Sequence, residues 1–315
     1  MTGGLGMAQR SVEILLAGYN GAAYLREQID SILAQTVRDW HLTLSDDGSS
    51  DGTAEIMDEY AQQYPDRIAR VRSGRRFGGA RPHFWWLLSR CEADCMFTCD
   101  QDDVWLPEKL EKTLAALDAA EREAGAETPL LVFCDSTPVD ARLQPLAPSM
   151  LRYQGQRLTD FNVRTLMLQN AVTGGAMCVN RPLVDLALRC ADPEAVIMHD
   201  HWLALAAARF GRVIYVDEPL YLYRQHGGNQ VGAQHVGSAS YVSRTLRSLK
   251  TIRTRLQEKK AQARAFANTY DDMLTEDDRA FLTQFCKNRS GPLFYWKNRR
   301  EISGFWRLAG MMLLG

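Results

Sequence analysis

Short apolar runs alternate with amphipathic segments from residue 12 to residue 134, and this alternation constrains the fold more than any other feature. The predicted strands lie at 12–17, 40–45, 68–72, 95–99 and 130–134, and the predicted helices at 24–35, 53–63, 83–89 and 107–123. Strands that alternate with helices are typical of a parallel, doubly wound sheet, whose ligands bind beyond the carboxyl ends of the strands. We therefore expect an α/β fold with its ligand site at that rim.

Polar clusters follow three of the predicted strands. They are Gly18-Tyr19-Asn20, Asp46-Asp47-Gly48 and Asp100-Gln101-Asp102. Because the carboxyl ends of parallel strands share one edge of a sheet, the three clusters should meet there, as a nucleotide site requires.

The third cluster carries the strongest chemical signal. Asp100, Asp102 and Asp103 come directly after an apolar run from Cys95 to Cys99. Strand side chains alternate between faces, so Asp100 and Asp102 would project together from the strand tip. Two carboxylates placed in this way suit Mg²⁺ or Mn²⁺, which keep positions open for substrate phosphates. The structural alternative is a solvated acidic turn.

The second cluster opens an eight-residue block, Asp46–Thr53, between a predicted strand and a predicted helix. Gly48 and Gly52 permit tight turns, and Ser50 or Asp51 can cap the helix. A carboxylate at the strand end can also accept a hydrogen bond from the imide N–H of uracil or thymine. A capped turn explains the glycines and Asp51, but it does not explain the paired Asp46-Asp47.

Charge is distributed unevenly along the 315 residues. Residues 241–315 contain 15 Lys/Arg and 7 Asp/Glu, a net charge of +8, whereas residues 1–240 contain 22 and 31, a net charge of −9. The acidic body lacks any motif that reads RNA or DNA, so nucleic-acid binding is not expected. The basic C-terminal region indicates an anionic surface as its partner.

Cysteine spacing and the lengths of the apolar segments limit the class of protein to which this chain can belong. The seven cysteines lack the paired spacing of zinc sites, so we expect free, mostly buried thiols in a reducing cytosol. Residues 1–10 lack the apolar region of a signal peptide and are expected to form a disordered leader. Because no run of about 18 apolar residues occurs, no transmembrane helix is expected.

The motifs together resemble those of a known enzyme family. Ala17–Asn20, Asp46–Thr53 and Asp100–Trp105 are similar to the motifs of inverting glycosyltransferases of family 2. The resemblance continues in the expected order with Thr173–Met177, Met198–Trp202 and Tyr223–Gly232, and it is strongest to the rhamnosyltransferase-like branch that builds bacterial cell-surface polysaccharides. It implies a GT-A fold, a Rossmann-like, mostly parallel sheet flanked by helices, over residues 11–235.

The resemblance also implies which residues bind the nucleoside and the metal. Tyr19 and Asn20, with Asp46 or Asp47, would contact the nucleoside. Asp100 and Asp102 match the Asp-x-Asp element that holds Mg²⁺ or Mn²⁺ on the donor diphosphate, and Gln101 lies between them. Asp103 would either cap the next helix or touch the sugar.

Two further loops are expected to help bind the donor. Arg81, with Arg75 and Arg76, would assist the phosphates, unless this segment is a solvated basic turn. His226 and Arg224 lie in a glycine-rich loop that would close over the donor and reach the diphosphate or the metal. The alternative for this loop is an ordinary flexible turn.

On the acceptor side, Asp200 matches the general base of the family. Alone, the motif would equally suit a helix cap by Asp200 with Trp202 as a core aromatic. His199 stands where other branches carry an acidic residue, so it would either tune Asp200 or only pack. Thr173, Gly174 and Gly175 would let the backbone approach the sugar or acceptor, with a strand bulge as the alternative; His199 and Trp202 are also expected on the acceptor side.

Residues 236–315 are predicted to form a basic, helical C-terminal region. Its helix 241–264 places Leu246, Leu249, Ile252 and Leu256 on one stripe, and eight Lys/Arg between 244 and 264 face Glu258 alone. Aromatic and basic residues alternate from 294 to 307, which is typical of an interfacial anchor. We expect peripheral attachment to anionic lipid on the inner face of the cytoplasmic membrane. The alternatives are packing on the catalytic domain or a homodimer contact.

The resulting prediction is a metal-dependent, inverting glycosyltransferase. It would move L-rhamnose from dTDP-β-L-rhamnose to a glycan or lipid-linked saccharide and leave an α-L-linkage. One alternative is the same mechanism with a UDP-hexose. A nucleotidyltransferase would need a lysine in the phosphate loop, which Gly18–Gly21 lacks, and a non-catalytic scaffold would not need Asp100, Asp102 and Asp200.

Overall fold

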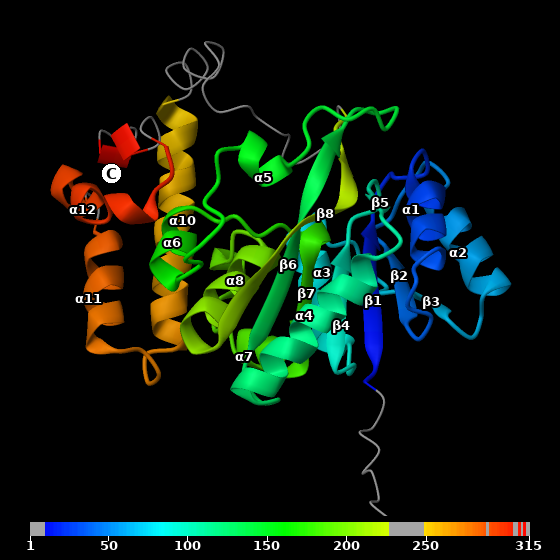
Figure 1. The fold of residues 1–315 in the computed structure, drawn as a ribbon, viewed down its shortest axis with the longest axis horizontal. Coiled ribbons are helices and arrows are strands. Elements are labelled where there is room, and N and C mark those ends of the chain that lie inside the picture. The colour runs from blue at the N-terminus through cyan, green and yellow to red at the C-terminus, as the bar shows by residue number, and fades with distance from the viewer. Residues whose placement is uncertain (1–9, 227–248, 288–289, 305–307, 310, 313–315) are drawn as a thin grey trace, which may run out of the picture.

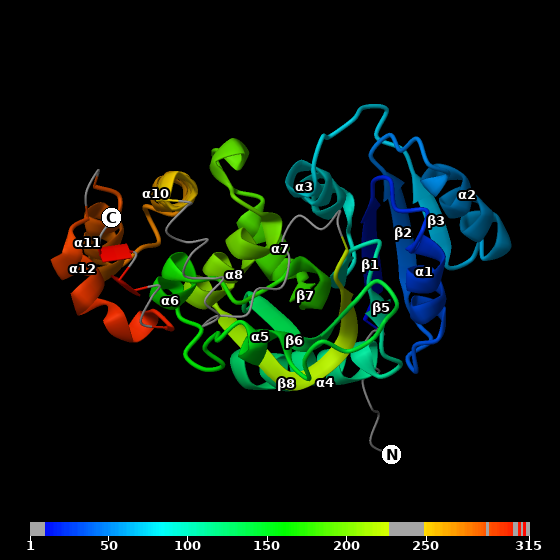
Figure 2. The same ribbon diagram turned by 90° about the horizontal axis from the view of Figure 1, so that it is seen from above.

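The computed structural model describes residues 10–226, 249–287, 290–304, 308–309 and 311–312. In this part of the chain eight strands form one curled sheet in the order β3-β2-β1-β4-β7-β6-β8-β5, flanked by helices (Figure 1). Helices α3, α7 and α8 lie on one face of the sheet, and α1 and α4 lie on the other (Figure 2). The predicted α/β class is confirmed.

The first four long strands of the sheet are parallel, as the alternation predicts. They are β1 (Val12–Gly18), β2 (His41–Asp46), β3 (Ile68–Val71) and β4 (Cys95–Cys99), joined by α1 (Leu25–Leu33), α2 (Thr53–Gln63) and α3 (Ala80–Arg90). Their interior side chains are almost all buried. Because β1 lies between β2 and β4, the polar clusters that follow these strands become neighbours.

The other half of the sheet is mixed. β7 (Met177–Asn180) runs antiparallel between β4 and β6 (Leu130–Val139), and β8 (Arg212–Arg224) runs parallel to β6. β5 (Val104–Trp105) pairs antiparallel with β8. Residues 137–139 extend β6 beyond the predicted strand 130–134 by pairing with the far end of β8, and α5 (Met150–Tyr153) follows.

Six further elements connect these strands and complete the body. They are α4 (Lys109–Ala124), α6 (Val163–Leu168), η1 (Gly174–Ala176), α7 (Arg181–Ala187), η2 (Pro193–Ala195) and α8 (His199–Phe210). All seven cysteines are free, and five of them are buried, as expected.

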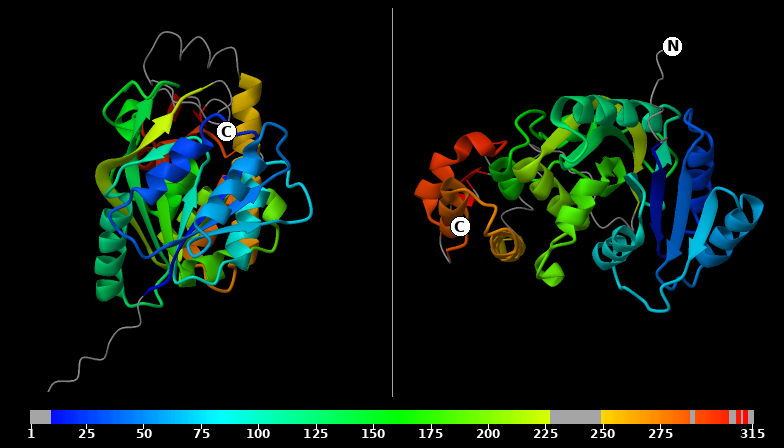
Figure 3. Two further views of the ribbon diagram at one scale, coloured as in Figure 1. Left: turned by 90° about the vertical axis from the view of Figure 1, so that its right-hand side faces the viewer. Right: turned by 90° about the horizontal axis from the view of Figure 1, so that it is seen from below.

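The C-terminal helices pack against the body on the side away from β1–β3 (Figure 3). They are α10 (Leu249–Thr269), α11 (Glu276–Phe285), α12 (Pro292–Lys297) and η3 (Arg299–Glu301). Trp202 of α8 lies 5.5 Å from Phe266 and 5.9 Å from Tyr270, measured between ring centres, so α10 shares a core with the catalytic half.

The predicted apolar stripe of the basic helix is only partly described. Leu246 and the side chains of Leu249 and Ile252 lie outside the described residues, and Leu256 is buried in the core. None of the described helices is long and apolar enough to cross a bilayer.

Candidate active site

The three polar clusters meet at the rim, and side-chain amides tie them together. The Gln101 side chain accepts a hydrogen bond from the Tyr19 N–H (2.7 Å) and donates one to the Tyr19 carbonyl (2.9 Å). Asn20 accepts from the Ser50 N–H at 2.9 Å, and Ser49 Oγ accepts from the Asn20 N–H at 2.9 Å. The residues predicted to bind the nucleoside therefore form one continuous surface.

Asp46 and Asp47 both shape loops of this surface. The Asp46 carboxylate accepts hydrogen bonds from the Gly48 and Ser49 N–H groups, each at 3.1 Å. Asp47 is buried, and its oxygens accept the N–H groups of Phe77 and Gly78. These bonds hold the loop at 77–78 against the strand end.

Tyr19 provides an exposed ring beside these carboxylates. Its side chain is 43% exposed, and the Arg76 guanidinium lies 4.7 Å from its ring centre while donating to its hydroxyl. An exposed aromatic ring at a strand end is a surface on which a nucleoside can stack.

An acidic centre lies at the tip of β4. A Cβ atom placed on Gly175 would lie 3.1 Å from Asp100 Oδ2 and 3.0 Å from Asp103 Oδ2. Burial, followed by the charges of Asp102 and Asp200, raises the pKa of Asp100 to about 7. Asp103 is buried, and its Oδ2 has no hydrogen-bond partner in the described part of the chain. This crowding of carboxylates favours a bound cation.

Lys109, which the motifs did not reveal, lies beneath the acidic centre. Its side chain is fully buried, its Nζ donates to the Gly175 carbonyl at 2.6 Å, and it lies 3.4 Å from the centre of the Trp105 ring. Burial lowers the pKa of Lys109, whereas the nearby thiols and the carboxylates of Asp103 and Asp100 raise it. One sequence signal could have revealed Lys109. It lies in the first turn of a predicted helix, where the helix dipole disfavours a cation unless another interaction requires it.

His226 and Arg224 have different surroundings. His226 Nε2 lies 2.7 Å from Asp102 Oδ2, and its ring packs on Tyr24 with centres 4.8 Å apart. Arg224 is buried; its Nε donates to the Asp102 carbonyl at 2.9 Å, and its guanidinium also pairs with Glu27. His226 thus faces the acidic centre, while Arg224 braces its backbone. The loop at 227–232 lies outside the described residues.

A cation is not held by a preassembled set of ligands. Within the described ranges no three His, Cys, Asp or Glu side chains converge on one point, so Asp100, Asp102 and His226 do not form a closed site. The residues nevertheless fit Mg²⁺ or Mn²⁺, which proteins commonly hold with one or two carboxylates plus substrate phosphates. The unpartnered Asp103 Oδ2 and the mutual repulsion of the carboxylates support this fit.

Asp200 lies in the first turn of α8, next to η1, and its charge helps to raise the pKa of Asp100 in the acidic centre. Burial raises the pKa of Asp200 to about 7, against hydrogen bonds from the N–H groups of His201 and Gly174. Met198 occupies the N-cap position, so Asp200 does not cap the helix.

The predicted acceptor residues next to Asp200 gather around η1. A Cβ atom on Gly174 would lie 3.0 Å from His199 Nε2, and Thr173 Oγ1 lies 3.1 Å from the Tyr221 hydroxyl. His199 stacks on Phe84 at 4.3 Å, and neither of its ring nitrogens has a partner among the described residues. Burial lowers the pKa of His199 to about 3, so the ring is neutral.

Two predicted site residues lie away from this cluster. Arg81 pairs with Glu194 at 2.7 Å and also donates to the carbonyl of Val196, so it holds the loop before α8. Trp202 is fully buried, and its Nε1 donates to the Ala187 carbonyl at 3.1 Å. Asp200 and Trp202 are two residues apart, about 200° around a helix, so their side chains leave α8 on opposite sides. Arg81 and Trp202 thus bond within the protein here, and their expected contacts with the donor and the acceptor stay predictions.

The profile of Glycosyl transferase family 2 matches residues 14–172, which is half of the chain and includes the acidic centre. The chain belongs to glycosyltransferase family 2. Asp200 and His226 lie beyond the matched range.

Individual glycosyltransferases resemble this family 2 chain to different extents. It is 28% identical to the dTDP-rhamnosyl transferase RfbG of Shigella flexneri over 91% of this chain and 94% of RfbG. It is 34% identical to EpsE of Bacillus subtilis over 44% of this chain, and the match spans only about half of EpsE (49%). TarS 1–349 of S. aureus superposes with a TM-score of 0.54 at 13% identity, over 96% of this chain and 90% of TarS 1–349, which supports the GT-A fold.

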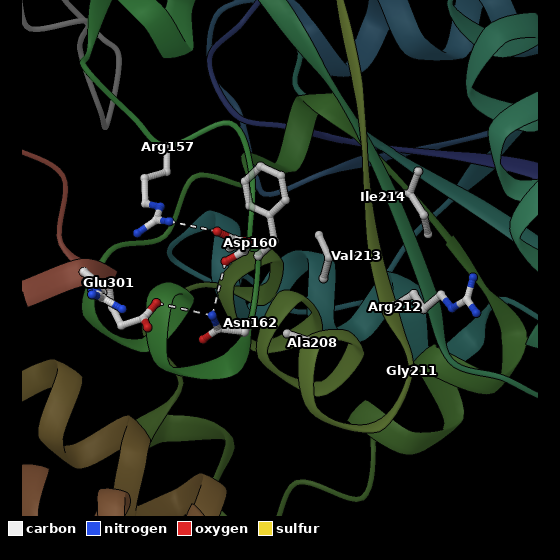
Figure 4. A pocket seen from close by; sticks show the side chains of 11 residues that line it. Arg157, Asp160, Asn162, Ala208, Gly211, Arg212, Val213, Ile214 and Glu301 are labelled. Atoms are coloured by element: carbon white, nitrogen blue, oxygen red, sulfur yellow. Dashed lines mark hydrogen bonds and ion pairs between the residues drawn. The ribbon is translucent and has the colours of Figure 1, made fainter. Parts of the chain in front are cut away.

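A separate cavity of about 570 Å³ lies at the start of β8, at the end of the strand away from the glycosyltransferase site (Figure 4). Arg157 pairs with Asp160 at 2.9 Å on its wall, and Asn162 donates to Glu301 at 3.3 Å. Arg212, also on the wall, pairs with Glu123 at 2.9 Å. The named charged side chains on the wall of this cavity therefore pair with other side chains of the protein.

Proposed function

We propose that this chain is a metal-dependent, inverting glycosyltransferase that transfers L-rhamnose from dTDP-β-L-rhamnose to a hydroxyl of a cell-surface glycan or lipid-linked saccharide. One observation carries the proposal. Adjacent glycines of η1 lie against the two carboxylates: a Cβ atom on Gly174 would lie 3.9 Å from Asp200 Oδ2, and one on Gly175 would lie 3.1 Å from Asp100 Oδ2. Carboxylates from two distant motifs thus face a single backbone turn, one suited to the acceptor and the other to the donor.

Asp200 would act as the general base. The acceptor oxygen forms a bond to the anomeric carbon while the bond from that carbon to the diphosphate oxygen breaks. The leaving diphosphate takes the bonding electrons, and the acceptor proton passes to the Asp200 carboxylate. A base whose pKa is near neutrality suits this task, and one displacement inverts the centre.

Asp100 and Asp102 would hold Mg²⁺ or Mn²⁺, which when bound supplies positive charge that stabilises the leaving diphosphate. Lys109 keeps the acidic centre from being wholly anionic before the donor arrives, because its ammonium group is buried below the carboxylates.

The rhamnosyl donor is supported by the similarity to RfbG, which covers nearly the whole of both chains. The second candidate is a UDP-hexose donor, because TarS 1–349, which shares the fold, has a structure in complex with UDP-GlcNAc. In competition for the protein with Mn²⁺, dTDP-L-rhamnose should displace UDP-glucose, UDP-galactose and UDP-N-acetylglucosamine. A clear preference for a UDP-sugar would replace the donor and leave the mechanism intact.

Attachment to the inner face of the cytoplasmic membrane is part of the proposal. Leu293 and Trp296 lie three residues apart on α12 and are 63% and 50% exposed, beside the exposed cations Lys297, Arg299 and Arg300. Phe294 and Tyr295 are buried, so Trp296 alone of these three aromatic residues can meet lipid. An exposed aromatic ring among cations suits an anionic lipid surface.

The decisive experiment is Asp200→Asn, which keeps the shape of the side chain but cannot accept the proton. Removing a general base typically lowers turnover by about 10² to 10⁴. Affinity for the donor should change little, because the base acts on the acceptor. If the variant keeps more than about a tenth of wild-type turnover, Asp200 is not the base, and Asp103 becomes the next candidate.

A further inference from the structure

We infer that Gln262 of the C-terminal helix α10 is a positioning residue for Asp200, so that the C-terminal region is part of the catalytic apparatus. The inference rests on the proposed role of Asp200 as the general base. It adds a residue that lies outside the motifs identified in the sequence and more than 60 positions from Asp200.

Gln262 bridges the two sides of the turn that carries Asp200. Its side chain is fully buried. Its Oε1 accepts a hydrogen bond from the N–H of Ile197 at 2.8 Å, and its Nε2 lies 3.0 Å from Nδ1 of His201. Ile197 and His201 flank Asp200 in the sequence, so one amide group from α10 holds both flanks.

The chemistry of the partners allows only one arrangement of this bridge. The Ile197 N–H can only donate, so Oε1 faces it and Nε2 faces His201. His201 Nδ1 must then accept, and its Nε2–H donates to the Leu166 carbonyl at 2.9 Å. Burial, and then the charge of Lys259, lowers the pKa of His201 to about 3, which keeps the ring neutral as this arrangement requires. A fully satisfied buried network of this kind is rigid.

Arg81 braces the loop as far as Val196, but residues 197–200 have few other polar supports among the described residues. Met198 at the N-cap position offers no side-chain cap. His199 makes no hydrogen bond through its ring within the described residues. Within the described part of the chain, the hydrogen bonds to the Asp200 carboxylate come from backbone N–H groups and not from side chains. Loss of Gln262 would therefore let the carboxylate shift, and a displacement of about 1 Å can cost about 10²-fold in rate.

The same helix supplies a matched control. Thr269 Oγ1 accepts a hydrogen bond from the N–H of Ala191 at 3.2 Å, which ties α10 to the segment after α7. Thr269→Val removes this bond without changing the shape of the side chain. It weakens the packing of α10 but does not touch either flank of Asp200.

The test is a double-mutant cycle between Gln262→Met and Asp200→Asn in the full-length protein. The measured rate is the release of nucleoside diphosphate in the presence of Mn²⁺, per mole of folded protein. The donor is either dTDP-L-rhamnose or UDP-glucose, whichever the wild-type protein hydrolyses faster. Gln262→Met should lower kcat by about 10- to 100-fold. The affinity for dTDP with Mn²⁺ should stay within about twofold, because the donor side is intact. In the Asp200→Asn background the same substitution should have almost no further effect, and Thr269→Val should keep wild-type kcat.

Two results would overturn the inference while leaving the proposed function standing. One is wild-type turnover of Gln262→Met when Asp200→Asn is inactive. The other is an equal fractional loss of rate from Gln262→Met in both backgrounds, since that is the signature of a general loss of structure. If Gln262→Met does not fold, His201→Phe removes the same contact from the opposite side and enters the same cycle. Full activity of Asp200→Asn would instead refute the proposed role of Asp200 as the general base, on which the inference rests.

Discussion

At the scale of single residues, Asp200 shows how burial and hydrogen bonding compete. Burial raises its pKa to about 7, and the N–H groups of His201 and Gly174 oppose that rise. The carboxylate is therefore half ionised near neutrality, where small changes in pH alter its ability to accept a proton.

The first prediction concerns the pH dependence of turnover. Because the base must be deprotonated, kcat should rise with pH up to about 7 and level off above it. The profile should be measured with saturating Mn²⁺, since a bound cation keeps Asp100 ionised over the whole range. A flat profile between pH 5 and pH 8 would contradict the assignment of Asp200.

The second prediction concerns stability. The folded protein holds the Asp200 proton more tightly than the unfolded chain, in which the pKa is 3.8. The protonated Asp200 therefore contributes to the free energy of unfolding. This contribution is fully present below pH 3.8 and is lost as the pH rises through about 7. Asp200→Asn should therefore gain melting temperature over the wild type between pH 5 and pH 8. A constant difference across that range would show that burial does not penalise the charge.

The third prediction concerns the metal. Excess EDTA should abolish turnover, and Mn²⁺ or Mg²⁺ should restore it. Asp102→Ala should weaken the binding of dTDP when metal is present and leave the weak metal-free binding unchanged, which calorimetry can compare directly. Full turnover in EDTA would leave Lys109 and the nearby arginines to neutralise the leaving group.

The sequence reveals some of these residues and hides others. Asp100, Asp102 and Asp200 stand in short motifs whose spacing survives in the linear chain. Lys109 and Gln262 do not, because each acts on a residue far away in sequence and looks like an ordinary helical position. Arg81 was expected at the site from its basic segment and Trp202 from its motif, but a sequence pattern does not reveal that each side chain also bonds to a distant carbonyl or carboxylate of the protein.

At the scale of elements, η1 connects the acidic centre around Asp100 with the acceptor side around Asp200. Thr98 Oγ1 donates to the Gly174 carbonyl at 2.6 Å, and Lys109 donates to the Gly175 carbonyl. Both carbonyls are thus anchored, and a Cβ atom on the same two residues would lie 3.9 Å from Asp200 Oδ2 and 3.1 Å from Asp100 Oδ2.

The fourth prediction is that Gly175→Ala damages this connection. The new methyl group would lie 3.0 Å from Asp103 Oδ2 and 3.1 Å from Asp100 Oδ2, closer than carbon and oxygen normally approach. Crowding of this kind costs about 1–3 kcal/mol, so the affinity for dTDP with Mn²⁺ should fall by about tenfold or more. The affinity for dTDP without metal serves as the control. If the affinity with Mn²⁺ were unchanged, η1 would be able to shift away from the carboxylates.

The parallel half of the sheet was predictable element by element, but the mixed half was not. β1 to β4 alternate with amphipathic helices, and this local pattern fixes their class and direction. β7 is four buried residues, and β5 is two, so neither has a period that distinguishes a strand from a helix end. Their directions depend on partners far along the chain.

At the scale of the whole molecule, the acidic body and the basic C-terminal region are joined by charge as well as by packing. Arg209 of α8 pairs with Asp278 of α11, and Arg164 of α6 pairs with Asp277. The exposed cations of α12 and η3, which are Lys297, Arg299 and Arg300, lie on the outer side of this assembly.

The fifth prediction tests attachment to lipid. The protein should float with vesicles of anionic phospholipid at low salt and dissociate at high salt, since each basic residue near such a surface contributes about 1 kcal/mol. Replacing both Leu293 and Trp296 with Ser should weaken flotation, while exposed Leu146, on the segment before α5, offers a matched control. No flotation of the wild-type protein at low salt would refute the membrane proposal.

The bridge from α10 to the turn before α8 also determines how such enzymes can be recombined. A chimera that joins two relatives near residue 235 takes its base from one parent and the support of that base from the other. A chimera joined between α5 and α6 instead takes α6, α8 and α10 from one parent, so that Asp200 and Gln262 stay together. Acceptor specificity should therefore be inherited with the C-terminal helices, and evolution by exchange of segments would favour breakpoints that keep Asp200 and Gln262 in the same parent.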